Sequence, residues 1–338
     1  MKSVINGLSN SILVALSEKS EWVSSARMVA QFGVSRMAVS KQVSRLRSLG
    51  YGIEALPRRG YRLTARTDLA VAEEVTPMLR TRILGRPYLY FKKVNSTNAF
   101  LRSRIAEFPE GATVAADSQS NGRGRFLREW FSPPGVNVYL SVLLKPARSP
   151  LIAPQLALVA AAAMIRAFNA AGCEEVRVKW PNDILWRGKK IAGILCEMDA
   201  EADVIRAVIV GIGVNVNLTE FPENLSPTAT SLRMALGRMV PVPALTAEIL
   251  NCLDTEYANW SRDGLPGITG FLNRHSMLSG LDVAIDMTSE KVSGRVERIT
   301  DTGMLRLIQT DGTVRDIASG EVRLCRPGST IEGTRDHE

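Results

Sequence analysis

The spacing of apolar residues along the chain begins with a helical period. Near the N-terminus apolar residues recur every three or four positions, as in helices that bury one face. Three short helices are predicted there. Ser35 caps the third, which covers residues 36–49 and ends at Gly50, a residue type that favours helix ends. A tight turn at Gly33 joins the second and third helices, which is typical of a helix-turn-helix.

Two short apolar runs follow in residues 51–63, around a tip of Arg58, Arg59 and Gly60, and they predict a β-hairpin wing. The polar face of the third helix and the wing tip carry groups able to contact phosphates and base edges. The side chains predicted to face DNA are Ser35, Arg36, Ser40, Lys41, Ser44, Arg47, Arg58 and Arg59. The alternative is a helical protein-interaction module with a solvated basic face.

The middle of the chain alternates between strand and helix patterns, which predicts an α/β sheet with helices packed on it. Residues 66–82 are predicted to form a connecting helix. A helix over residues 97–108, capped by Ser96 or Thr97, and an alanine-rich helix over residues 154–171 follow. The predicted strands cover residues 88–91, 113–116, 138–144, 176–179, 191–197 and 204–210.

The last region has a two-residue period and predicts a small β-barrel. Short strands alternate there, with turns at Gly303 and at Asp311-Gly312. The tail that follows is polar and is expected to be mobile. The predicted parts are a winged helix (residues 1–65), a linker helix (66–82), a central α/β domain (83–279), a barrel (280–326) and a tail (327–338).

Charge is distributed unevenly, and this supports a nucleic-acid-binding N-terminal part. Residues 1–65 contain ten Lys or Arg and three Glu, so they carry +7 of the net charge of +8 and leave +1 for the rest. A basic module on a nearly neutral body is typical of a polyanion reader attached to a second function. The four cysteines include no CxxC pair, so neither a zinc site nor a disulfide framework is predicted. A cytoplasmic location is expected, without membrane contact.

Candidate chemistry begins in the segment Gln119-Ser-Asn-Gly-Arg-Gly-Arg-Phe-Leu-Arg-Glu-Trp130. Glycines let a backbone approach a ligand closely, and the arginines between them offer planar charged groups suited to carboxylate and phosphate oxygens. The segment could enclose an anionic, phosphorylated small molecule, or it could be a solvated basic loop.

Two further segments combine glycine with polar groups near the ends of predicted strands, where α/β folds place ligands. Lys179-Trp-Pro-Asn-Asp183 follows one strand, and the chain continues through Lys189 and Lys190 to Gly193 inside the next strand. Glycine within a strand often marks the close approach of a ligand or of another backbone. Gly211-Ile-Gly213-Val-Asn215 repeats the pattern, which is weak by itself.

The order and spacing of these motifs resemble those of the bifunctional biotin–protein ligase and biotin-operon repressor family. The resemblance covers nearly the whole chain, because the flanking winged helix and barrel match as well. The motifs that carry it are Ser96-Thr-Asn98, Gln119 with Gly122-Arg-Gly-Arg125 and Trp130-Phe-Ser132, Lys179-Trp-Pro-Asn-Asp183, Lys190-Ile-Ala-Gly-Ile-Leu195 and Gly211-Ile-Gly-Val-Asn215.

The resemblance implies a fold and a two-step reaction. The fold would combine a winged helix-turn-helix, a class II synthetase-like α/β domain with a mixed sheet, and an SH3-like β-barrel, an α+β multidomain protein. Biotin and MgATP would give biotinyl-5′-adenylate and pyrophosphate, and a lysine of a biotin carboxyl carrier protein would attack the mixed anhydride. The protein would also bind operator DNA as a homodimer and repress biotin synthesis genes.

The same resemblance implies roles for single residues. Lys190 and Arg125 would stabilise the acyl phosphate, and Asp183 would orient or deprotonate the incoming lysine. As alternatives, Lys190 is a solubilising strand-edge charge and Asp183 a turn cap, while Trp130 and Trp180 are expected to pack. No metal ligand is assigned. Biotin would contact Ser96, Thr97, Gln119, Gly122, Arg123, Gly124, Arg125, Lys190 and Gly193. The adenylate would contact Arg125, Lys190, Gly211, Gly213 and Asn215.

Several positions depart from the family's motifs. Leu127 stands where the loop usually has a third glycine, and Glu129 stands at a usually basic or neutral position. Cys325 stands where an adenine-side arginine is expected, which leaves Arg323 or Arg326 as the substitute. These departures keep open a biotin-sensing regulator without catalysis. A lipoate–protein ligase is the rival enzyme.

Overall fold

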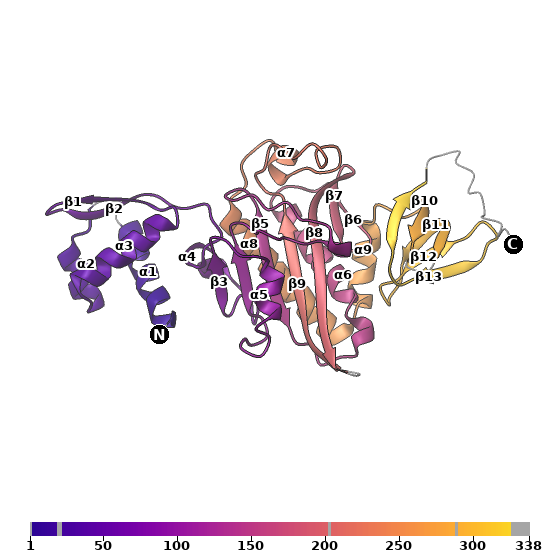
Figure 1. The fold of residues 1–338 in the computed structure, drawn as a ribbon, viewed down its shortest axis with the longest axis horizontal. Helices are drawn as coiled ribbons and strands as arrows, with labels where there is room; N and C mark the ends of the chain where they lie inside the picture. The colour runs from indigo at the N-terminus through magenta and orange to yellow at the C-terminus, as the bar shows by residue number, and fades with distance from the viewer. Residues whose placement is uncertain (1, 19–21, 202–203, 288–289, 326–338) are drawn as a thin grey trace.

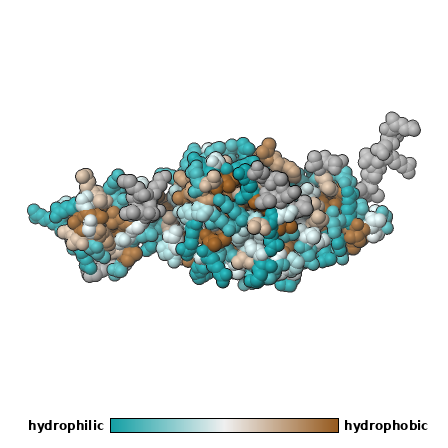
Figure 2. Space-filling model, turned by 90° about the horizontal axis from the view of Figure 1, so that it is seen from below, coloured by the Kyte–Doolittle hydropathy of each residue, from teal (hydrophilic) through white to brown (hydrophobic). Residues whose placement is uncertain are grey.

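The computed structural model describes residues 2–18, 22–201, 204–287 and 290–325. A small N-terminal domain, a large central domain and a small C-terminal domain follow one another along the long axis (Figure 1). On the face seen in Figure 2 the surface is largely hydrophilic, and apolar side chains form small separate patches. Within the described ranges, no helix is long and apolar enough to cross a membrane.

The N-terminal domain is a helix-turn-helix with a two-stranded wing, as predicted. Ser24 and Ser35 precede helices in extended backbone, and their side chains accept hydrogen bonds from the N–H groups of Arg27 and Ala38. Gly33 ends the second helix with a φ of 63°, a conformation that suits glycine. The elements are α1 (Lys2–Ser17), α2 (Ser25–Phe32), α3 (Arg36–Ser48), β1 (Gly52–Leu56) and β2 (Gly60–Ala65).

The segment after the wing is not the helix predicted for residues 66–82. Only α4 (Ala72–Val75) and the 3₁₀ turn η1 (Thr76–Met78) are helical there. Pro77 explains the break, because proline has no N–H to donate and its ring would clash with the carbonyl four residues earlier in a continuous α-helix. The linker is therefore irregular on both sides of a short helical segment at residues 72–78.

Side-chain contacts hold this linker to the domains on both sides. Toward the central domain, the Asp68 carboxylate accepts a 3.0 Å hydrogen bond from the Val242 N–H. Toward the winged helix, the buried Glu73 forms a 2.8 Å ion pair with Arg45 of α3. The linker thus connects the two domains as part of their packing and not as a free tether.

The central domain is built on a seven-stranded mixed sheet in the order β3-β4-β5-β9-β8-β7-β6. β3 and β4 are parallel, and the other neighbours are antiparallel. The strands are β3 (Tyr88–Phe91), β4 (Thr113–Ala116), β5 (Val138–Leu144), β6 (Val176–Lys179), β7 (Asp183–Trp186), β8 (Lys189–Glu201) and β9 (Val204–Val214). Every predicted strand is present. β8 and β9 exceed their predicted lengths because they pair with each other over most of their course.

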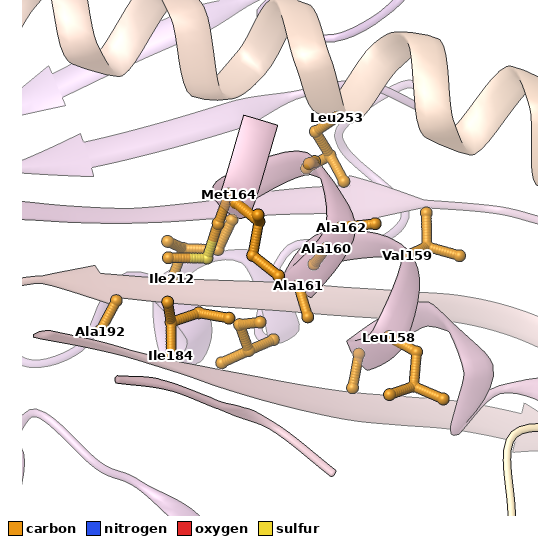
Figure 3. Packing of buried hydrophobic residues seen from close by; sticks show 14 of the residues in the cluster. Leu158, Val159, Ala160, Ala161, Ala162, Met164, Ile184, Ala192, Ile212 and Leu253 are labelled. Atoms are coloured by element: carbon orange, nitrogen blue, oxygen red, sulfur yellow. The ribbon is translucent and has the colours of Figure 1, made fainter. Parts of the chain in front are cut away.

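Helices cover both faces of this sheet. Figure 3 shows Ala160, Ala161 and Met164 of α6 between Leu253 of α8 and Ile212 of β9 in the main apolar core. Small alanine side chains let α6 lie close to both neighbours. The helical elements are α5 (Thr97–Arg102), η2 (Arg125–Leu127), η3 (Pro150–Ile152), α6 (Gln155–Ala170), α7 (Leu232–Leu236), α8 (Val242–Asp263) and α9 (Pro266–Arg274).

α5 ends at Arg102, before the predicted end of the helix at residue 108. The Arg104 N–H bonds to the Leu101 carbonyl three residues back, so the chain continues as tight turns. These turns let Ile105 and Phe108 fold back onto a second apolar cluster that contains Leu101. Packing on the outer face of the sheet therefore outweighs the local preference for a longer helix.

The C-terminal domain is a five-stranded antiparallel sheet in the order β13-β12-β11-β10-β14. Its alternate side chains, such as Val283, Ile285 and Val292, are buried in the core, which accounts for the two-residue period. Its strands are β10 (Asp282–Asp286), β11 (Lys291–Ile299), β12 (Leu305–Ile308), β13 (Val314–Ile317) and β14 (Glu321–Leu324). The tail at residues 327–338 lies outside the described residues.

Candidate active site

A cavity of about 290 Å³ lies where the central and C-terminal domains meet. Its wall includes the start of α5, the loop that follows β4, the β6–β7 turn, the neighbouring strands β8 and β9, part of residues 221–229, and residues 320–322. Motifs that are far apart in the sequence meet here. The predicted site residues that line it are Ser96, Thr97, Gln119, Arg123, Gly124, Arg125, Asp183, Lys190, Gly193, Gly211, Gly213 and Asn215.

Gly122, predicted to contact biotin, does not line this cavity. A Cβ at this position would lie 2.7 Å from Ser132 Oγ and 2.8 Å from the Trp130 carbonyl oxygen. The Trp130 N–H also donates a 2.9 Å hydrogen bond to the Gly122 carbonyl. Glycine is therefore needed here so that the two arms of the loop can pack together, and Gly122 acts on the shape of the loop.

Gly193 and Gly213 are direct partners across the β8–β9 ladder, which puts two positions without side chains next to each other. The Trp130 ring fills this space, since a Cβ at Gly213 would lie 2.5 Å from its Cε2 atom and one at Gly193 would lie 2.9 Å from Cζ3. Gly211 makes room for Asn98 in the same way. Trp130 thus forms part of the cavity wall, and its buried indole N–H has no partner among the described residues.

Lys190 and Asp183 face each other inside the cavity. Lys190 Nζ lies 2.7 Å from Asp183 Oδ1 and 5.2 Å from the centre of the Trp130 ring. The contact is electrostatic, because Asp183 Oδ1 has no hydrogen bond of acceptable angle within the described part of the chain. The side chains are only 34% and 26% exposed, which is little for a solvated surface charge.

Arg125 reaches the cavity from the loop and is held by both domains. Its Nη1 donates to Asn182 Oδ1 at 3.2 Å, and its Nη2 donates to the Gly320 carbonyl at 3.5 Å. Burial lowers the pKa of Arg125, and the nearby Asp183 and Glu321 carboxylates oppose that shift. A guanidinium keeps its charge in proteins, so Arg125 is a fixed positive group.

Another part of the cavity wall is polar without charge. Gln119 Oε1 accepts a 2.9 Å hydrogen bond from the Thr97 N–H, and Gln119 Nε2 donates to Ser132 Oγ at 3.2 Å. Ser96 caps α5 by accepting from the Ala99 N–H. An amide and hydroxyl groups in fixed positions can recognise a polar, uncharged ring.

The loop contains a strained pair at its tip. Phe126 and Leu127 have φ values of 54° and 58°, in the left-handed region that costs a residue with a side chain roughly 1–2 kcal/mol. Leu127, at the position of the family's third glycine, is 80% exposed. Glu129, the second departure in this loop, lies opposite Arg123 in an isolated antiparallel β-bridge between their backbones.

The C-terminal domain contacts the loop through a second arginine. Arg128 Nη2 donates to both carboxylate oxygens of Glu321 at 2.8 Å, and these hydrogen bonds hold the pKa of Glu321 below its ordinary value. Arg323, one of two candidates for the missing adenine-side arginine, pairs instead with Asp286 at 3.0 Å and does not line the cavity. The other candidate, Arg326, lies outside the described residues.

Sequence reasoning assigned no role to Asn98, Asn182 or Glu321, although all three line the cavity. Asn98 and Asn182 belong to the motifs quoted above, so the sequence marked their positions. It did not show which groups they contact. Glu321 also stands in a segment that resembles a family motif, Gly320-Glu-Val-Arg323-Leu-Cys325, but its approach to the cavity from a separate domain was not visible in the sequence.

The residues predicted to face DNA are exposed on α3 and the wing, and Arg47 and Arg59 are also held by neighbours. Arg47 Nε donates to the Ile53 carbonyl at 2.8 Å, and the Arg59 guanidinium lies 5.6 Å from the centre of the Trp22 ring. The exposed set is Ser35, Arg36, Ser40, Lys41, Ser44, Arg47, Arg58 and Arg59.

Comparisons with known proteins agree with this geometry. Residues 88–215 match the model of the biotin/lipoate A/B protein ligase family, and residues 9–62 match that of an HTH domain. The bifunctional ligase/repressor BirA of Bacillus spizizenii is 35% identical over 90% of this chain and 94% of its own. BirA of Escherichia coli is 29% identical over 92% and 96%. A biotin protein ligase from Aquifex aeolicus, solved in complex with biotin and ATP, is 28% identical with a TM-score of 0.63, over 71% of this chain and 98% of that one.

The fold and the cavity define a ligase of the biotin or lipoate type joined to a DNA-binding domain. These BirA proteins align with 90% and 92% of this chain at 35% and 29% identity, which confirms the resemblance seen in the motifs. The chain belongs to the family of bifunctional biotin–protein ligases and repressors.

Proposed function

We propose that this protein activates biotin with ATP and transfers it to a lysine of a biotin carboxyl carrier protein. The observation that carries the proposal is that Lys190, Arg125 and Asp183 share one cavity with the polar groups of Thr97 and Gln119. Charged groups suited to phosphate and carboxylate oxygens therefore lie next to polar groups suited to an uncharged ring.

In the first step a biotin carboxylate oxygen attacks the α-phosphorus of ATP, and pyrophosphate leaves. Two anionic groups must approach each other, and the cationic side chains of Lys190 and Arg125 offset the charge that builds up in the transition state. Arg125 is already held by Asn182 and the Gly320 carbonyl, so it needs little reorganisation during the reaction.

Magnesium would enter the site together with ATP. Mg²⁺ on a nucleotide keeps several waters and takes its other ligands mainly from phosphate oxygens and one or two carboxylates, and there it neutralises phosphate charge. In the described ranges no group of three or more His, Cys, Asp and Glu side chains is placed to hold a metal. The carboxylates that line the cavity, and that could complete the ligand shell of an ion carried by the nucleotide, are those of Glu129, Asp183 and Glu321.

In the second step the amine of the acceptor lysine attacks the acyl carbon of biotinyl-5′-adenylate, an amide bond forms, and AMP leaves. The attacking nitrogen must lose a proton. We assign its orientation and deprotonation to Asp183, because this carboxylate lies 2.7 Å from Lys190, beside the proposed position of the acyl phosphate.

The other cavity residues are assigned to the two halves of the intermediate. The polar groups near α5 would bind the biotin ring, the loop would cover the ligand, and the β9 end would take the nucleotide. The groups near α5 are Ser96, Thr97 and Gln119. The loop residues are Arg123 and Gly124, with Gly122 shaping the loop and Gly193 beneath it. The β9 end provides Gly211, Gly213 and Asn215.

We also propose that the protein represses transcription by binding operator DNA as a homodimer when the adenylate is bound. The exposed basic face of α3 and the wing supports DNA binding. The proposed location is the cytoplasm, where the four free cysteines would stay reduced.

Mass spectrometry of a purified biotin-acceptor domain tests the ligase function. The domain is incubated with this protein, MgATP and either biotin or lipoate, and a mass shift with biotin alone is expected. A shift with lipoate alone would make lipoate the substrate. No shift with either acid, together with tight biotin binding, would leave a biotin-sensing regulator.

A further inference from the structure

We propose that Glu197 fixes the direction of hydrogen bonding in the biotin site, and that the site thereby selects ligands with N–H donors. The Glu197 carboxylate does not line the cavity and has no role in the reaction described above. It acts through Asn98, Ser141 and Thr97, so it is a positioning residue. The inference rests on the proposed function, because it takes the ureido ring of biotin as the group beside Thr97 and Gln119.

The chain of contacts begins at Glu197 on β8. Its Oε2 accepts a 2.7 Å hydrogen bond from Asn98 Nδ2, and its Oε1 accepts a 3.1 Å bond from Arg102. Asn98 Nδ2 also donates to the Leu195 carbonyl at 3.2 Å. A carboxylate and a carbonyl can only accept, so the Asn98 amide cannot turn over, and its oxygen faces away from Glu197.

Ser141 on β5 is the next group, and it is fully buried. Its Oγ lies 2.6 Å from Asn98 Oδ1 and 2.7 Å from Thr97 Oγ1. A hydroxyl has one proton and an amide oxygen can only accept, so the Ser141 proton points to Asn98. The contact between Ser141 and Thr97 then needs the Thr97 hydroxyl as its donor. The Thr97 hydroxyl proton thus has two acceptors within reach, Ser141 Oγ at 2.7 Å and Gln119 Oε1 at 3.2 Å.

Gln119 is fixed from the opposite side. Ser132 Oγ donates to the Trp130 carbonyl at 2.8 Å, so it accepts from Gln119 Nε2. The Gln119 oxygen therefore points toward Thr97, whose N–H donates to it. Thr97 Oγ1 and Gln119 Oε1 lie 3.2 Å apart, farther than the 2.7 Å from Thr97 Oγ1 to Ser141, which favours Ser141 as the partner of the Thr97 proton.

Two acceptor oxygens therefore lie side by side in the cavity wall, and they suit a ligand that brings N–H groups. The cyclic urea of biotin does so, whereas the dithiolane ring of lipoate has none. A site built to pair with a donor rejects ligands that lack it, because its own polar groups would then be buried without partners.

Close packing leaves this chain of contacts little freedom. Thr97 and Asn98 are each 4% exposed, so solvent cannot readily replace a lost partner. A Cβ at Gly211 would lie 2.2 Å from Asn98 Oδ1, so even the strand beneath leaves the amide in one position. The direction of every hydrogen bond therefore follows from the groups at its ends.

Calorimetry with biotin alone, and with a cyclic carbamate analogue in which oxygen replaces one ureido N–H, tests the inference without turnover. Glu197→Gln is expected to weaken biotin binding about tenfold, since the Gln amide can turn its own NH₂ group toward Asn98, which leaves the 3.2 Å bond to the Leu195 carbonyl to hold the Asn98 amide alone. Binding of the carbamate should change less, so the discrimination between the two ligands shrinks. Ser141→Ala removes the central hydroxyl and should have the same effect, and it serves if Glu197→Gln does not fold.

Arg102→Ala is the matched control. It removes the partner of the other Glu197 oxygen, from a side chain that is 59% exposed, and should leave both affinities within about twofold of wild type. Wild-type biotin affinity in both Glu197→Gln and Ser141→Ala, or equal losses for biotin and the carbamate, would overturn the inference and leave the proposed function intact. Failure of the wild-type protein to bind biotin would remove the proposed function, and the inference with it.

Discussion

Lys190 is the residue on which the activation step should depend most, because its ammonium lies within the cavity beside Asp183. Lys190→Ala is expected to slow biotinyl-adenylate formation at least about 100-fold, a loss of roughly 3 kcal/mol of transition-state stabilisation. Pyrophosphate release at saturating biotin and ATP measures the effect. Lys189→Ala is the control, since this neighbour is exposed outside the cavity and should keep the wild-type rate. A near-wild-type rate for Lys190→Ala would refute the role.

Leu127 should set how long the loop stays closed over the adenylate. Glycine adopts a φ of 58° without the strain that leucine bears there, so Leu127→Gly should favour this loop conformation by about 1 kcal/mol. The half-life of the purified adenylate complex is then expected to rise about fivefold.

Arg58→Gly is the control for this change, because it relieves a φ of 65° in the wing, away from the cavity, and should leave the half-life as it is. If Leu127→Gly also left it unchanged, the observed loop conformation would not be the one that retains the adenylate.

Residues in short local motifs could be found from the sequence, and those that act across segments could not. Lys190 and Arg125 stand in dense runs of glycine and charge, and the structure places both in the cavity. The importance of Asn98 comes from Glu197 and Ser141, which lie on two other strands. No spacing in the sequence indicates that these three meet.

At the scale of elements, predictions succeeded where the signal is local. α2 and α3 begin after Ser24 and Ser35, whose caps need only the N–H three residues further on. The predicted helix at 66–82 failed because Pro77 and hydrogen bonds to two domains determine the course of the linker. Tertiary contacts of this kind are not visible in the periodicity of one segment.

The exposed polar face of α3 should bind DNA mainly through phosphate contacts. Arg36→Ala and Lys41→Ala are each expected to weaken binding of duplex DNA and to lower the slope of log K against log salt by about 1, because each removed contact releases one fewer counterion. Fluorescence anisotropy over a salt series measures the slope. Lys291→Ala, on an 80% exposed lysine of the C-terminal domain, should leave it unchanged. Unchanged slopes for both α3 variants would place the DNA elsewhere.

At the scale of the whole molecule, the ion pair between Arg45 and Glu73 joins the winged helix to the linker. The Glu73 side chain is 2% exposed and that of Arg45 is 35% exposed, so Glu73→Gln should cost about 2 kcal/mol of local stability, less than for a fully buried pair. Amide exchange in α3, followed by mass spectrometry, should then accelerate roughly 30-fold.

The control for this change is Glu54→Gln, which breaks a pair with Arg62 that is exposed on both sides and should cost less than about 1 kcal/mol. Equal exchange in wild type and Glu73→Gln would mean that the pair does not hold the domains together.

The fixed linker constrains the spacing of the DNA half-sites that a dimer could bind. In the proposed homodimer, each α3 helix would stand at a place set by the central domain, because Asp68 bonds the linker to that domain and Glu73 bonds it to the winged helix. The dimer would then bind two half-sites together only when their separation places both on the same side of the duplex. Five base pairs inserted between two half-sites, about half a turn, would put them on opposite sides of the DNA and should abolish paired binding while each half-site remains intact.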